Sequence, residues 1–313
     1  MITSIFSKSK PINFLIVFVL TALSFLIVKF KYVQEPVASL FILKQVSTFM
    51  VAYLSILLLN FITTKNDLTQ KSNLEIILFS LFLLLIPDAL VSAKVIWANF
   101  FILFALRRLI SLRTKKNTKS KLFDAALCIT IAWLFYFWAI LFLVLIPLVL
   151  LFHSSNDVKH WLIPIVGVVT VFILCISTSI VVNNSYLGFF NSNYQTSFSF
   201  IKYNSLPFLV ALTLLFSFGF WSVFYYLKSF RTKIRTIRPA YKTILAMLIL
   251  AFILFVIAPN KNGSEILFLF APLAIIIANY IETISDKWFK QVFFGVLLVT
   301  PIILLVLQFF TKS

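Results

Sequence analysis

The sequence is poor in acidic residues, in glycine and in cysteine, and each shortage excludes a class of protein. Only 9 of the 313 residues are Asp or Glu, and charged residues make up 12% of the chain. A soluble domain carries about 25% charged residues, so the one or two soluble domains that the length allows are excluded. Apolar residues make up 62% of the chain and come in long runs. They predict a single membrane-embedded domain over residues 1–313.

Glycine and charge within the membrane are the features on which many transporters depend. The chain has five glycines, and none of its nine carboxylates falls at the centre of a predicted span. Broken transporter helices use glycine, and an ionisable residue inside a span commonly marks an ion or proton path. The sequence also contains no internal repeat. A small-solute transporter is therefore a less favoured function than a lipid-handling or structural subunit or a glycosyltransferase.

The residue patterns of common active sites are also missing. Cys128 and Cys175 lie in apolar runs and are interpreted as packing residues. His153 and His160 are seven residues apart without further ligands, so no metal site is predicted. The sequence has no P-loop, no Rossmann glycine pattern, no G-x-S-x-G and no H-E-x-x-H, which argues against an ATPase or a soluble-type hydrolase. No cofactor is predicted.

Positive charge, by contrast, is abundant, with 27 Lys and Arg residues and a formal net charge of +18. Seven of these basic residues lie in the loop 107–121 and six in the loop 228–242. Because this clustering beside apolar helices is typical of cytoplasmic loops, nucleic acid is rejected as a partner. We expect both loops to contact anionic lipid headgroups. The pattern predicts a multi-pass protein of the bacterial cytoplasmic (inner) membrane with its N-terminus in the cytoplasm.

A membrane span needs about 20 mostly apolar residues, and the chain offers ten or eleven such membrane segments. The fold class expected is an all-α polytopic bundle. The first apolar run is too long for the hydrophobic part of a signal peptide and is interpreted as an uncleaved span. The predicted spans are Ile12–Phe30, Lys44–Ile62, Leu74–Val91, Val95–Leu112, Trp161–Val182, Leu206–Leu227, Tyr241–Ala258, Ile266–Ile281 and Gln291–Phe310, with an apolar stretch over 123–152.

The stretch 123–152 is ambiguous, because 30 helical residues rise only about 45 Å, too little for two full spans and a turn. An even number of crossings must join two cytoplasmic loops, and the two clear spans between the basic loops already give an even number. The stretch is therefore expected to enter and leave on one side, as paired short helices or as a re-entrant hairpin turning near Tyr136–Trp138. The alternative is one long helix kinked at Pro147.

This topology places 7 of the 27 basic residues outside and the other 20 in the cytoplasm, with an external C-terminus. It also creates an external loop over 183–205 that is rich in Tyr and Phe. We interpret this loop as an aromatic belt in the headgroup layer. A second interpretation is a platform for sugars or lipid headgroups. The contact candidates are Lys94, Tyr186, Tyr194 and Tyr203.

The carboxylates on the predicted external face are Glu35, Asp88 and Glu265. If Glu35 and Asp88 converge, they supply a general base and a metal ligand, and they are the catalytic candidates. The alternative is structural. Asp88 then pairs with Lys94 or caps a helix, and Glu35 faces water.

The opening residues Met1–Phe14, MITSIFSKSKPINF, and the layout of the apolar runs resemble a family of inner-membrane proteins of flavobacteria and other Bacteroidota. The resemblance covers essentially the whole chain. It implies location and topology and carries no known activity.

Parts of the chain also resemble the C-type glycosyltransferases, multi-spanning enzymes that use sugars linked to polyprenyl phosphate. Ala89–Arg113 resembles their fourth-span region, the stretch 123–152 their paired short helices, and Ile266–Ile281 with its Ala-Pro-Leu-Ala segment a late Pro-containing span. Those enzymes carry an acidic motif, often a pair of carboxylates, in the first external loop, where this chain has only Glu35. The resemblance therefore implies a related scaffold more than it implies catalysis.

The leading hypothesis is a lipid-handling or structural subunit of an envelope complex, built on a glycosyltransferase-like scaffold. Its partners would be membrane lipids and other envelope membrane proteins. The alternative is an active glycosyltransferase that moves a sugar from a polyprenyl phosphate, with a divalent metal as its cofactor.

Overall fold

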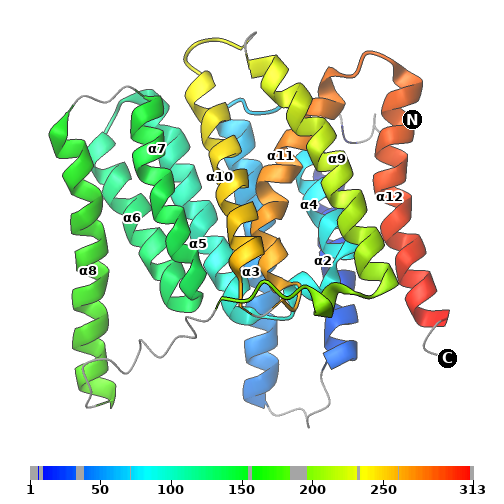
Figure 1. Ribbon diagram of the computed structural model, residues 1–313, viewed down its shortest axis with the longest axis horizontal. Coiled ribbons are helices and arrows are strands. Elements are labelled where there is room, and N and C mark those ends of the chain that lie inside the picture. The colour runs from blue at the N-terminus through cyan, green and yellow to red at the C-terminus, as the bar shows by residue number, and fades with distance from the viewer. Residues whose placement is uncertain are drawn as a thin grey trace. The chain divides into compact units, whose positions relative to one another are not determined.

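The computed structural model describes residues 6, 10–32, 39–70, 72–153, 157–183, 196–230, 233–259 and 261–310. The structure is 86% helical, and no strand occurs in these ranges (Figure 1). The prediction of an all-α protein is confirmed. The reason is physical, since an apolar segment in lipid must satisfy its backbone N–H and C=O groups internally, and a helix does so.

Among the described residues, eight helices are long and apolar enough to cross a membrane. The protein is therefore a multi-pass integral membrane protein. These candidate spans are Pro11–Phe30, Phe41–Lys65, Ala93–Thr114, Val158–Val182, Leu206–Phe230, Arg238–Ile257, Ser264–Thr283 and Lys287–Val306.

The contacts divide the chain into two compact units, each assembled from separate stretches of sequence. Unit 1 contains Met1–Ile96, Ser199–Lys233 and Lys261–Ser313, and unit 2 contains Trp97–Phe198 and Ile234–Asn260. The elements of unit 1 are α2 (Pro11–Tyr32), α3 (Ser39–Lys65), α4 (Leu74–Leu85), η1 (Pro87–Leu90), η4 (Ile201–Tyr203), α9 (Leu206–Phe230), η5 (Ser264–Ile266), α11 (Leu267–Thr283) and α12 (Lys287–Phe310).

The core of unit 1 is the pair α4 and α11. Every residue of α4 is buried, and α2, α3, α11 and α12 all pack against it. Phe270 of α11 contacts Phe79 and Phe82 of α4 with ring centroids 5.9 and 5.7 Å apart. The two helices are thus shielded by protein on all sides.

Proline ends α4 well before the predicted span Leu74–Val91 is complete. Pro87 has no backbone N–H to continue the helix, and it forces Ile86 out of the helical region, to φ −129° and ψ 78°. The chain continues as the short turn η1, which carries Asp88. With 12 residues, α4 rises only about 18 Å and does not match the length of a span.

Unit 2 holds most of α5 (Ala93–Ile110), followed by a hairpin within the stretch 123–152. The hairpin's first arm ends at Phe135, and Tyr136 is extended, with φ −141° and ψ 110°. The second arm returns along the first, and Pro147 lies in its first α-helical turn without breaking it. The elements of unit 2 after α5 are η2 (Ser111–Thr114), α6 (Thr118–Phe135), η3 (Phe137–Val144), α7 (Leu145–Phe152), α8 (Val158–Asn183) and α10 (Arg238–Ile257).

Within unit 2, α8 approaches α6 more closely than large side chains would allow. A Cβ placed on Gly167 of α8 would lie 2.9 Å from both the Ala126 Cβ and the Phe123 carbonyl oxygen of α6. Small residues permit such close crossings of membrane helices. Gly167 therefore sets the distance between these two helices.

Candidate functional site

The structure describes three of the six residues predicted from the sequence as catalytic or contact candidates. Glu35, Tyr186 and Tyr194 lie outside the described residues. Lys94 is exposed in the first turn of α5, and Tyr203 is buried in η4. The proposed convergence of Glu35 with Asp88 therefore stays a prediction.

Asp88 is half-buried in η1 and lies against the loop that precedes α11. Turns η1 and η5 pack together, and a Cβ on Gly263 would lie 3.0 Å from the Asp88 Cβ. Gly263 also has a φ of +92°, a backbone conformation that glycine adopts without strain. Glycine at this position thus allows the loop to pass directly over Asp88.

The same loop carries Glu265, which is fully buried in η5. Its Oε1 accepts the Gly263 N–H at 3.4 Å, whereas its Oε2 is buried without a hydrogen-bond partner among the described residues. Asn262 braces the loop, because its Oδ1 accepts both the N–H and the hydroxyl of Ser264 at 3.3 and 2.7 Å. Asp88 and Glu265 thus lie on two turns in direct contact.

Aromatic rings and a lysine surround this loop. Tyr203 stacks on Phe208 with ring centroids 4.5 Å apart, and Phe208 in turn lies beside Gly263. The ammonium group of Lys261 lies 4.5 Å from the centre of the Phe200 ring. Lys261 is only 2% exposed, and this burial lowers its pKa. Tyr203 therefore supports the loop through Phe208. Its predicted contact with a headgroup stays a prediction.

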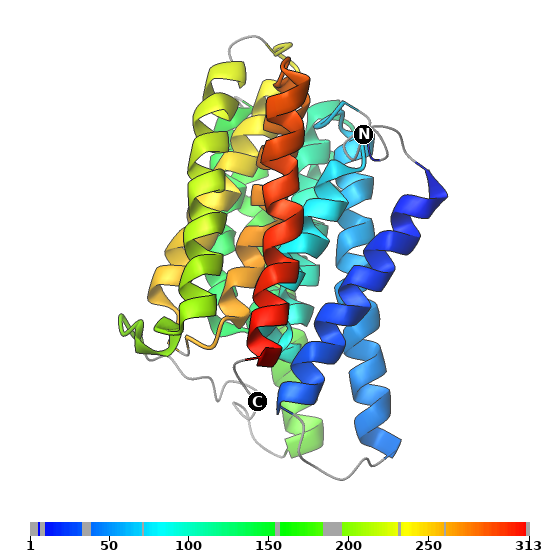
Figure 2. The ribbon, with the colours of Figure 1, turned by 90° about the vertical axis from the view of Figure 1, so that its right-hand side faces the viewer.

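A groove between α2 and α3 is the other site-like feature of unit 1. It has a volume of about 560 Å³ and an almost entirely apolar lining. Figure 2 shows α2, in dark blue, crossing α3, in lighter blue, at an angle. The lining includes Phe25, Lys29 and Phe30 of α2 with Phe41, Gln45 and Phe49 of α3.

Lys29 marks one end of the groove, where its ammonium group lies 4.9 Å from the centre of the Phe25 ring. Lys44 of α3 is close enough for its charge to repel that of Lys29. Neither lysine forms an ion pair with a described residue. The C-terminal half of α2 lines the groove, and α2 also packs against η1, the turn that carries Asp88. The groove and the Asp88 turn are therefore both in contact with the same helix.

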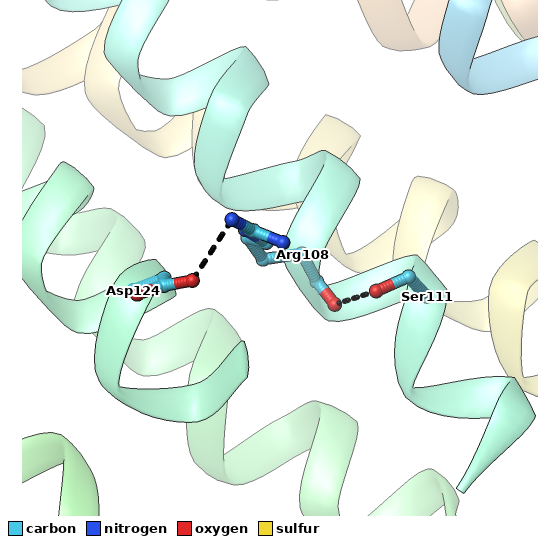
Figure 3. Close-up of polar contacts among 3 residues, drawn as sticks. All are labelled: Arg108, Ser111 and Asp124. Atoms are coloured by element: carbon cyan, nitrogen blue, oxygen red, sulfur yellow. Dashed lines mark hydrogen bonds and ion pairs between the residues drawn. The ribbon is translucent and has the colours of Figure 1, made fainter. Parts of the chain in front are cut away.

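Arg108 of the predicted cytoplasmic loop 107–121 forms an ion pair with Asp124, just beyond that loop in unit 2. Figure 3 shows Arg108 of α5 pointing towards Asp124 of α6, with the Arg108 Nη2 and Asp124 Oδ2 3.0 Å apart. The Ser111 hydroxyl donates to the Arg108 carbonyl at 2.8 Å. Lys121 donates to the Ser111 carbonyl and to the Thr114 hydroxyl at 2.6 and 2.8 Å. These contacts join α5 to α6 and leave Lys115 and Lys116 exposed.

Glu265 is one of the three carboxylates predicted on the external face, but the predicted catalytic pair is Asp88 with Glu35. Lys261 is one of the seven basic residues predicted on the external side, but it was not predicted to lie at a functional site. The available signal was the Asn262-Gly263-Ser264 turn immediately before an apolar run, which places Glu265 at a helix start. Chemically, the two turns together offer two carboxylates and a buried cation, a set suited to proton transfer and to binding a phosphate or sugar.

No described group of three or more His, Cys, Asp or Glu side chains is arranged to hold a metal ion. A divalent cation at this loop would have to draw on Asp88, Glu265 and neutral oxygens such as the Asn262 amide, the oxygen ligands that hard cations prefer.

The chain belongs to a protein family of unknown function, DUF6427, whose model matches residues 1–312. No curated protein and no solved structure matches it.

Proposed function

We propose that this membrane protein binds a phosphate-bearing lipid through unit 1 and acts as a lipid-handling subunit of a bacterial envelope complex. The hydrocarbon chain occupies the α2–α3 groove, and the phosphate lies at Lys29 and Lys44. The observation that carries the proposal is the apolar groove lined at one end by Lys29, whose charge is repelled by that of Lys44, while neither lysine has a carboxylate partner among the described residues.

The charge arrangement favours an anionic lipid over a neutral one. Two ammonium groups that repel each other are stabilised by a phosphate placed between them. The Phe25 ring, whose centre lies 4.9 Å from the Lys29 ammonium group, adds a cation–π contact on one side of this charge. In the predicted orientation, this end of α2 faces the outside of the inner membrane, and the exposed Lys115 and Lys116 contact anionic headgroups on the cytoplasmic side.

The proposal is tested by measuring the lipid that co-purifies with the protein in native nanodiscs, using mass spectrometry. Lys29→Gln is expected to lower phospholipid or polyprenyl-phosphate retention by about tenfold, since one charge-assisted contact is worth about 1.5–3 kcal/mol. Ala22→Trp, which fills the groove, is expected to release the lipid as well. The mass of the retained lipid distinguishes a phospholipid from a polyprenyl phosphate.

The matched control is Lys287→Gln, which removes the same charge from an exposed position in the first turn of α12. It should retain as much lipid as the unmodified protein. Equal retention in Lys29→Gln and Lys287→Gln, or protein that carries no lipid, would reject the groove as a lipid site.

The contact between the Asp88 and Glu265 turns favours a second candidate function, a polyprenyl-phosphate-sugar transferase. One carboxylate would accept the proton of the acceptor hydroxyl, whose oxygen attacks the sugar C1 as the bond from C1 to the phosphate oxygen breaks. In this case Asp88→Asn and Glu265→Gln abolish sugar transfer and leave lipid retention unchanged. The first-loop Glu35→Gln variant is expected to do the same.

A further inference from the structure

The other end of α4 holds a cluster of buried polar groups that the proposed function does not use. Glu75, in the first turn of α4, is fully buried, and so is Asn73 just before it. One carboxylate oxygen of Glu75 and both side-chain polar atoms of Asn73 are buried without a hydrogen-bond partner among the described residues. In the predicted topology this end of unit 1 faces the cytoplasm.

The position of Thr63 indicates where a proton lies. Its hydroxyl oxygen is 2.8 Å from the Glu75 Oε1 and 2.9 Å from the Asn60 carbonyl oxygen. A hydroxyl has one hydrogen and can fully satisfy only one of these acceptors. Both contacts are satisfied together if Glu75 is a carboxylic acid that donates to Thr63, while Thr63 donates to the Asn60 carbonyl.

A second carboxylate lies nearby and is held differently. Glu282 of α11 accepts the Gln70 N–H at 2.8 Å and also the Ser72 hydroxyl. The positive charges of Lys233 and Lys290 favour the ionised form of the Glu282 carboxylate. These hydrogen bonds and charges favour the ionised form of Glu282 and oppose the effect of its burial. Glu75, by contrast, is contacted by Thr63 and by its own backbone N–H, and no positive charge of a described residue acts on it.

The charges around Glu75 do not favour its ionised form. α2, α3, α11 and α12 pack against α4, and Glu282 of α11 is the charged group that acts on Glu75, by repulsion. Lys10, Lys65 and Asp67, from the segments flanking α2 and α3, are exposed. Lys290 of α12 is half-buried and acts on Glu282. A buried carboxylate without a cation is strongly unfavourable, whereas the neutral acid is tolerated.

We infer that Glu75 is a proton-binding site, which holds a proton in the native fold and exchanges it with water at this end of unit 1. The proton shared by Glu75 and Thr63 keeps the carboxyl neutral beside the anionic Glu282. The inference is independent of lipid binding, because Asp88 and the α2–α3 groove lie at the opposite end of α2 and α4.

Infrared spectroscopy of the full-length protein in nanodiscs tests this directly when it is carried out on a Glu265→Gln background, because Glu265 is a second fully buried carboxyl. At neutral pH we expect the C=O stretch of a protonated carboxylic acid, shifted by exchange into D₂O. The band should be absent from Glu75→Gln, whose amide can still donate to Thr63 and therefore preserves the fold. It should remain in Glu282→Gln and in Asp88→Asn, the matched carboxylate controls.

Three outcomes would overturn the inference. They are the absence of this band at neutral pH, its persistence in Glu75→Gln, and its loss when Na⁺ or Mg²⁺ is added, which would replace the proton with a metal cation. If Glu75→Gln does not fold, Glu75→Asp serves as the second variant. It retains the acid on a shorter side chain, so the band should shift if it arises from this residue and stay in place if it does not.

Discussion

At the scale of single residues, Gly263 is the position where one added carbon would disturb the candidate site most directly. Gly263→Ala introduces a Cβ at a φ of +92° and 3.0 Å from the Asp88 Cβ. We expect a loss of roughly 1–3 kcal/mol in the free energy of unfolding, because strained backbone and a steric clash act together. Thermal unfolding in detergent measures it.

The control for this variant is Gly295→Ala in α12, where a Cβ would meet nothing within 4 Å. Alanine is favoured over glycine in a helix interior, so this change should leave stability equal or raise it by about 0.5–1 kcal/mol. A Gly263→Ala protein as stable as Gly295→Ala would show that the loop does not depend on glycine.

Residue types alone could not reveal which carboxylates are buried. Glu75 and Glu265 both lie at the ends of apolar runs, where a sequence pattern indicates exposure at the membrane surface. In the structure both are fully buried, because α4 and α11 are enclosed by other helices. Burial of a span end depends on contacts between segments far apart in sequence, and apolar periodicity carries no information about them.

At the scale of elements, the positions of helices were predictable and their breaks only partly so. Most apolar runs predicted helices to within a few residues, because length and hydrophobicity decide that structure in lipid. Leu74–Val91 was predicted as one span, yet Pro87 divides it into α4 and η1. The Pro-Asp pair was visible in the sequence and breaks the helix through local stereochemistry, but the packing of η1 against η5 joins segments far apart in the chain and could not be predicted from it.

The crossing of α6 and α8 is an element-scale feature that can be tested. Gly167→Ala places a Cβ 2.9 Å from the Ala126 Cβ and from the Phe123 carbonyl oxygen, and the backbone atom cannot rotate away. We expect α8 to separate from α6 and stability to fall by roughly 1–3 kcal/mol, the range for overpacked cores. Thermal unfolding measures the loss, and unchanged stability would mean that the two helices do not cross at Gly167.

At the scale of the whole molecule, charge decides the topology more strongly than hydropathy does. The two basic loops 107–121 and 228–242 lie on one side only if the segments between them cross an even number of times. The structure shows α6 and the returning η3–α7 arm as two antiparallel pieces, followed by α8 and α9. The even number holds whether the hairpin crosses the membrane fully or re-enters from one side. The returning arm η3–α7 is shorter than an ordinary span.

Labelling of single cysteines in intact cells resolves this topology. In a background with Cys128→Ser and Cys175→Ser, we expect Lys116→Cys and Arg235→Cys to resist a membrane-impermeant maleimide, because both basic loops are predicted to be cytoplasmic. Tyr136→Cys should react if the hairpin reaches the external face, and resist if it re-enters from the cytoplasm. Both results preserve the even number of crossings. External labelling of only one basic loop would instead require an odd number of crossings between the two loops. External labelling of both would keep the number even but reverse the predicted orientation, and with it the sides assigned to the Asp88 and Glu75 ends of unit 1.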